Sequence, residues 1–286
     1  MDEAEIIVLM ISLAVSIFFF IKWYGRIVRS CLPERNRTAR VTLCILPLLS
    51  FLIIFYTLRV LASFDVINDF GYITLYILLG YAWVSFGMYI IFPLFDISWA
   101  DDVLNSNNEA ALWVVTGGFL GLTAIYSGAN IGDGPGWWCV IIAGGLGLVA
   151  WFILGFIANR LNHVLERVTI GRDLGCGIRF GGYMLAAGII LGRACAGDWT
   201  SFSQTIIELK DGWPVLCLAA LEAITEHFYF NRGESETGQD GGVTRSVIWA
   251  GVFIVFAIIS VVLLPPLSEN PLYSVMNPLL SIWRSI

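Results

Sequence analysis

Charged residues are scarce in this chain: they make up 13% of its 286 residues, whereas about a quarter is usual in a soluble domain. The net charge of −6 argues against nucleic acid as a partner, because a face that binds phosphates needs an excess of Lys and Arg. These shortages indicate that the chain is neither an ordinary soluble protein nor a nucleic-acid-binding one.

The signatures of common enzymes and metal sites are also missing. The six cysteines include no C-x-x-C pair and no zinc-ligand spacing, and there is no phosphate-binding loop, dinucleotide fingerprint or nucleophile elbow. Only two histidines are present, His163 and His227. We therefore expect a protein that is not an enzyme, with no catalytic residues, no cofactor and no metal. A weak metal or proton site formed by the two histidines and Glu226 is the alternative.

Apolar residues make up 58% of the chain, and its mean hydropathy is +0.80. Most of the apolar runs approach or exceed the roughly 20 residues that cross a bilayer core of about 30 Å. The expected spans are residues 6–21, 41–64, 72–95, 110–131, 138–158, 174–196, 213–230 and 246–264. The sequence thus predicts an all-α, polytopic membrane helix bundle of about eight spans.

Three segments divide this bundle. Residues 1–71 hold two spans joined by a basic inner loop, and residues 72–232 hold the glycine-rich bundle. Residues 233–286 hold a flexible inner loop, the last span and a surface tail. A short interfacial helix is also expected at residues 202–209, because apolar and polar residues are interleaved there.

The basic residues predict the orientation in the membrane. The N-terminus is acidic and the loop after the first span is basic, so the positive-inside rule places the N-terminus outside. With eight spans, the C-terminus is then outside as well. Eleven of the sixteen Lys and Arg fall in loops expected inside or at their edges: Lys22, Arg26, Arg29, Arg35, Arg37, Arg40, Arg160, Arg167, Arg172, Arg232 and Arg245.

A pattern of glycines occurs twice, which indicates an internal repeat. Gly117-Gly118 recurs as Gly181-Gly182 and Gly128 recurs as Gly192, both after 64 positions (181 − 117 and 192 − 128). His163 and His227 share this shift. Because each unit contains two helices, the two units are expected to run parallel to each other.

Small residues at intervals of four let membrane helices approach closely. We therefore interpret these glycines as packing seams within the bundle or between subunits; walls of a narrow substrate or ion path are the alternative. The glycines concerned are Gly117, Gly118, Gly121, Gly128, Gly177, Gly181, Gly182, Gly188 and Gly192.

Ionisable residues inside spans are costly, so they indicate a partner or a function. Arg179 and Arg193 lie on the sixth span, about four turns apart. Glu222 and Glu226 lie one turn apart on the seventh span, next to His227. We expect Arg179 to pair with Glu226 or Glu222. A proton or ion relay and simple snorkelling of the arginines are the alternatives, and Arg59 on the second span is a further possible partner for Glu222.

The stretch N-N-E-A-A-L…G-G-x-x-G…S-G-A (residues 107–129), echoed at residues 172–197, resembles the domain of unknown function 350 family of bacterial inner-membrane proteins. The resemblance covers roughly Tyr72 to Arg232. It implies a helical bundle in a bacterial inner membrane and no particular reaction. The second copy departs from the pattern, because Arg172-Asp173 stands where an Asn-Ala-like start is usual.

Two functions fit these features. The first is an ion or small-solute conduit, oligomeric and embedded in the lipid bilayer, favoured by the glycine-lined helices and the intramembrane charges. The second is a non-catalytic structural or accessory subunit of a larger membrane complex, which the same packing features fit equally well.

Overall fold

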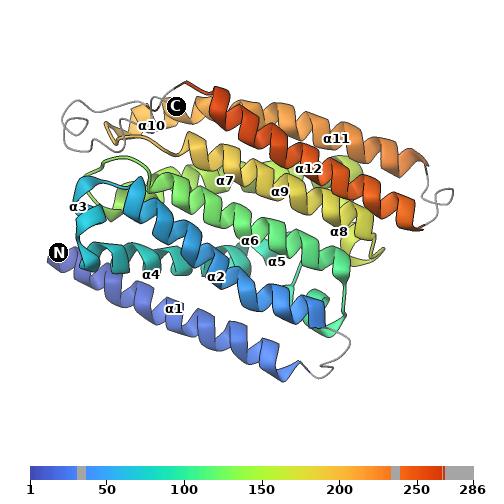
Figure 1. The fold of residues 1–286 in the computed structure, drawn as a ribbon, viewed down its shortest axis with the longest axis horizontal. Coiled ribbons are helices and arrows are strands. Elements are labelled where there is room, and N and C mark those ends of the chain that lie inside the picture. Colours follow the sequence, from blue (N-terminus) through green and yellow to red (C-terminus); the bar gives the residue numbers. More distant parts are fainter. Residues whose placement is uncertain (31–36, 233–238, 266, 268–286) are drawn as a thin grey trace.

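The computed structural model describes residues 1–30, 37–232, 239–265 and 267, and these residues are almost entirely helical. Long helices lie side by side and cross the molecule from end to end (Figure 1). They are α1 (Glu3–Arg29), α2 (Arg37–Val60), α4 (Phe70–Phe86), α6 (Glu109–Ala129), α7 (Trp137–Asn162), α9 (Leu174–Ala194), α11 (Pro214–Arg232) and α12 (Gln239–Leu263).

Short helices lie at the two ends of the bundle or continue a long helix. They are α3 (Phe64–Asn68), η1 (Gly87–Ile91), α5 (Phe92–Leu94), η2 (Trp99–Asn105), α8 (Val164–Thr169), α10 (Phe202–Glu208) and η3 (Leu209–Gly212). We call the end with η2 and α8 the basic end and the end with α3 and α10 the acidic end; they lie at the right and left of Figure 1.

In the described part of the chain, seven helical runs are apolar and long enough to cross a membrane: α1, α2, α4 continued to Leu94, α6, α7, α9 and the part of α12 from Gly242. A helical bundle with these seven runs is that of an integral membrane protein. The eighth expected span, α11, does lie in the bundle but is not among the seven. It has only 19 residues and carries Glu222, Glu226 and His227.

Several boundaries differ from those expected. α1 is longer at both ends, because Asp2 and Glu5 form a capping box at its start and Arg26 and Arg29 suit its last turn. α2 stops at Val60, before the separate helix α3. A helix, α10, occupies the segment predicted to be interfacial, while η2 and α8 lie in segments predicted to be loops.

Four residues with left-handed backbone conformation shape the basic end. Asp96 precedes η2 and His163 precedes α8, with φ angles of 53° and 51°. Asn107 and Arg172, both with φ of 52°, directly precede the N-cap residues of α6 and α9. Each of the two glycine-rich helices is therefore entered through a short helix and a left-handed residue.

The most buried helices, α6 and α9, form the centre of the bundle and pack against each other along their length. α2 packs on α6 and α12 packs on α9, while α7 contacts both. α1 and α12 are mostly exposed and carry many large apolar side chains on their outer faces, as expected for contact with lipid.

Glycines at matched positions meet at the interface of α6 and α9. A Cβ atom added to Gly117 would lie 2.0 Å from the carbonyl oxygen of Gly181, and one added to Gly128 would lie 2.0 Å from that of Gly192. A Cβ on Gly188 would lie 2.4 Å from the Cα of Gly121. No side chain fits between these backbones, so the two helices are in direct contact and the glycines line no path between them.

The remaining glycines serve other contacts. A Cβ on Gly177 would meet the backbone of Ala110 at the start of the same interface. Gly118 faces the ring of Phe92 instead, and Gly182 faces Ala250 of α12. These glycines thus lie at three helix contacts, those of α6 with α9, of α6 with α5 and of α9 with α12.

Candidate functional site

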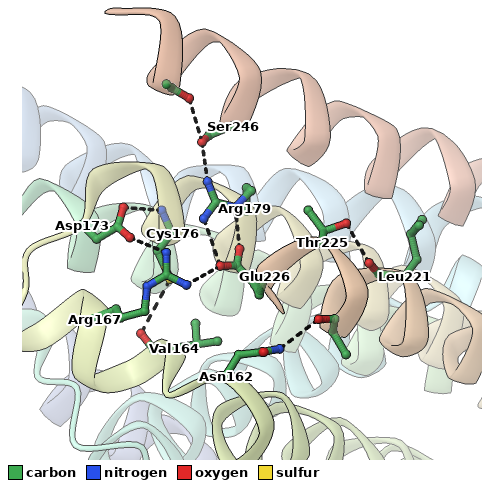
Figure 2. A network of polar contacts seen from close by, with 12 residues as sticks. Asn162, Val164, Arg167, Asp173, Cys176, Arg179, Leu221, Thr225, Glu226 and Ser246 are labelled. Carbon is green, nitrogen blue, oxygen red and sulfur yellow. Dashed lines mark hydrogen bonds and ion pairs between the residues drawn. The ribbon is translucent and has the colours of Figure 1, made fainter. Parts of the chain in front are cut away.

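Arg179 of α9 meets Glu226 of α11, and Arg167 of α8 lies beside them (Figure 2). Arg179 is fully buried. Its Nε donates to Glu226 Oε1 at 2.5 Å and its Nη2 donates to Glu226 Oε2 at 2.9 Å, so the pair is bidentate. The remaining Nη1 donates to the hydroxyl of Ser246 on α12 at 2.6 Å, and the guanidinium lies 3.9 Å from the ring centre of Tyr229.

A second arginine joins this cluster from α8. Arg167 Nη1 donates to Glu226 Oε2 at 2.8 Å, and its Nη2 donates to Asp173 Oδ2 at 2.6 Å. Asp173 is also the N-cap of α9, because its Oδ1 accepts the backbone N–H of Cys176. Burial alone would lower the pKa of Arg167, but the negative charges of Glu226 and Asp173 leave that pKa raised.

The cluster of Arg167, Asp173, Arg179 and Glu226 is neutral as a whole, with two positive and two negative groups. Arg167 and Asp173 keep 15% and 11% of their side chains exposed, whereas Arg179 and Glu226 keep 1% and none. The network therefore leads from the surface of the basic end into the interior, with every charge paired.

Glu222, one turn before Glu226 on α11, differs from the residues of this cluster. Its side chain is fully buried, and neither carboxyl oxygen has a hydrogen-bond partner. The hydroxyl of Tyr183 on α9 is buried without a partner as well, and it is close enough to interact electrostatically with Glu222. Tyr183 in turn packs edge-on against Phe253 of α12. The carboxyl thus lies in the region where α9, α11 and α12 meet.

The expected pair between Arg179 and Glu226 is therefore present, whereas a pair with Glu222 is not. Arg59 does not reach Glu222 either, because its Nη1 donates to the carbonyl of Ile67 near the acidic end. Arg193 lies at the acidic end of α9, as expected, and donates to the carbonyl of Pro265. Neither residue belongs to the cluster.

Both histidines are exposed. His227 directly follows Glu226 in α11, and the ring of His163 is 3.6 Å from the carboxylate of Glu166. Among the residues that the structure describes, no group of three or more His, Cys, Asp or Glu is arranged to hold a metal ion.

Sequence reasoning missed four members of the site: Arg167, Asp173, Ser246 and Tyr183. Arg167 and Asp173 were assigned to an inner loop, although an Asp directly before an apolar run is a helix N-cap signal. Ser246 and Tyr183 are polar residues within apolar runs, a weaker signal that gains meaning only once α9 and α12 are seen to be neighbours.

A cavity of about 300 Å³ lies at the acidic end, among the loops that follow α2, α6 and α9. Its loops hold one another: the backbone N–H of Asp133 donates to Asp198, and that of Phe64 donates to Asp133. Burial raises the pKa of Asp65, with smaller contributions from Glu5 and Asp69. The acidic residues that line the cavity are Glu5, Asp65, Asp133, Asp198 and Glu208.

A scan against protein-family models found no matching model, and searches of curated proteins and of solved structures found no match either. Membership of the domain of unknown function 350 family is therefore neither supported nor contradicted.

Proposed function

We propose that this integral membrane protein carries a small ion across the bilayer, and that Glu222 is the residue that binds the ion. The observation that carries the proposal is the buried carboxyl of Glu222, whose two oxygens have no hydrogen-bond partner. A buried, unpaired carboxylate is strongly destabilising, so a protein that keeps one generally uses it.

The position of Glu222 supports this role. Its neighbour Tyr183 is nine residues (183 − 174) into the 21 residues of α9, about 14 Å along a helix of about 31 Å. Glu222 is therefore close to the middle of the membrane-spanning layer. The paired cluster lies between it and the basic end, so polar groups lead from that surface to the midpoint.

We further infer that α6–α7 and α9–α11 are two copies of one parallel unit. The direct contacts of Gly117 with Gly181 and of Gly128 with Gly192 support this, because both pairs keep the same shift of 64 positions. The orientation with the basic end in the cytoplasm, and a bacterial inner membrane as location, remain part of the proposal.

Reconstitution into liposomes tests the function. Purified protein should support flux of a proton or a monovalent cation under an imposed membrane potential, and Glu222→Gln should remove it. The matched control is Glu109→Gln, because Glu109 is an exposed carboxylate at the start of α6. Absence of flux for every small ion, or equal flux in the Glu222→Gln protein, would count against the proposal.

A structural or accessory subunit is the second candidate. It is favoured by the sealed interface of α6 and α9 and by the aliphatic residues that α9 buries beyond Tyr183, such as Ala187 and Ile190. This function predicts that the chain purifies from native membranes bound to other proteins and conducts no ion in isolation.

A further inference from the structure

The surroundings of Glu222 also bear on which ion it binds. Three polar atoms are buried here without a hydrogen-bond partner: the two carboxyl oxygens of Glu222 and the hydroxyl oxygen of Tyr183. The neighbouring Thr225 hydroxyl is committed, because it donates to the carbonyl of Leu221 within the same helix. The site therefore offers few free oxygen atoms.

A divalent metal cation needs more ligands than this. Calcium takes six to eight oxygens, and magnesium demands a near-ideal octahedron. The backbone carbonyls of α9 and α11 cannot readily make up the difference, because they are bonded within their own helices. A proton requires only one carboxyl oxygen.

The charges that act on Glu222 point the same way. They come from Glu226 on its own helix, Arg179 on α9 and Arg167 on α8, and no group from the described side chains of α12 is among them. Both arginines are already paired with Glu226, and Arg167 also with Asp173. An ionised Glu222 would add one uncompensated negative charge to a neutral cluster, whereas a protonated one adds none.

We propose that Glu222 is a proton-binding site in the centre of the bundle, with the Tyr183 hydroxyl as its neighbour, so that the ion this protein carries is the proton. The identity of the carried ion rests on the proposed transport function, whereas proton binding by Glu222 does not. A proton arriving from the basic end passes the partly exposed Arg167 and Asp173 and the bidentate pair before it reaches the carboxyl.

Infrared spectroscopy of the full-length protein in lipid tests the proton on Glu222 directly. At neutral pH, the wild-type protein should show the carbonyl band of a protonated carboxyl, and Glu222→Gln should lose the intensity of one such group. Glu109→Gln should leave the band unchanged. An identical band in the wild-type and Glu222→Gln proteins would overturn the proposal.

A second measurement covers the case in which Glu222→Gln does not fold. Tyr183→Phe keeps the ring and its packing on Phe253 but removes the hydroxyl, so the carboxyl band should shift in frequency without losing intensity. A band that does not respond to this change would contradict the placement of the Tyr183 hydroxyl beside the protonated carboxyl, and with it the proposal.

The infrared result and the flux result can fail separately. A protonated Glu222 in a protein that shows no ion flux would contradict only the proposed transport function. Flux of sodium or potassium ions that needs Glu222, with no protonated carboxyl at this position, would support transport and refute the proton.

Discussion

Replacing Glu226 with leucine is the sharpest test of the buried cluster. Glu226 is fully buried and accepts hydrogen bonds from both Arg179 and Arg167. Its loss leaves two positive charges against Asp173 alone, and Arg179 keeps only the Ser246 hydroxyl and the ring of Tyr229. Removing one partner of a buried pair typically costs about 3–5 kcal/mol, so a loss of this size is expected.

The double change Arg179→Met/Glu226→Leu should be milder than the single one. It removes one positive and one negative charge together, and the pair between Arg167 and Asp173 remains. Apolar replacement of a whole buried pair is often close to neutral, so most of the lost stability should return. The exposed contact of Glu166 with His163 supplies the control, because breaking a surface pair of this kind costs about 0–1 kcal/mol even when both groups are charged.

Unfolding by titration with SDS in mixed micelles, followed by circular dichroism, measures these free energies. The reasoning is refuted if Glu226→Leu costs no more than Glu166→Gln. It is equally refuted if the unfolding free energy that the double variant loses equals the sum of the losses in Arg179→Met alone and in Glu226→Leu alone. In that case the two residues do not interact.

Three further changes test other parts of the structure. Gly128→Ala should destabilise the bundle by about 1–3 kcal/mol in the same SDS titration, since its Cβ would strike the backbone of α9, whereas Gly145→Ala, with nothing within 4 Å, should not. In a cysteine-free background, Ser106→Cys at the basic end and Ser203→Cys at the acidic end should react with an impermeant thiol reagent from opposite sides of the membrane. Asp65→Asn should stabilise the protein at neutral pH. Because the pKa of Asp65 is raised in the folded protein, the folded state favours the protonated carboxyl, and the stability of the wild-type protein falls as the pH rises through that pKa. The stability gained by Asp65→Asn should therefore vanish at pH values below the pKa of Asp65 in the unfolded chain, as thermal unfolding at several pH values will show.

Much of the fold is predictable because hydropathy alone marks membrane helices. In lipid, the backbone must satisfy its own hydrogen bonds, so a long apolar run has almost no alternative to a helix. The glycine pairs were predictable for a related reason: only small residues let two backbones touch, so their spacing marks the contact faces of α6 and α9.

The site was harder to predict, because it depends on the register between helices. The sequence placed Arg179, Glu222 and Glu226 in one layer, but not which carboxylate the arginine reaches. That choice depends on the position of α11 along the axis of α9. The segment with α10 and η3, which joins the two helices, determines this position. The short helix α8, which brings Arg167 to Glu226, begins at a left-handed His163 that hydropathy does not reveal.

A comparison of the two inferred copies distinguishes a structural role of the cluster from a functional one. At the shift of 64 positions, Arg179 corresponds to Val115, Glu226 to Asn162, Glu222 to Ala158 and Tyr183 to Phe119. All four counterparts are buried, and three of them are apolar. If the two units are copies, the first copy packs this region without charges, which favours a role for these groups other than packing. A buried ion pair is at best weakly stabilising compared with apolar residues of similar volume. The second copy therefore gains little stability from its four ionisable or hydroxyl groups. The proposed proton-binding carboxyl at Glu222 gives a reason for their presence in one copy only.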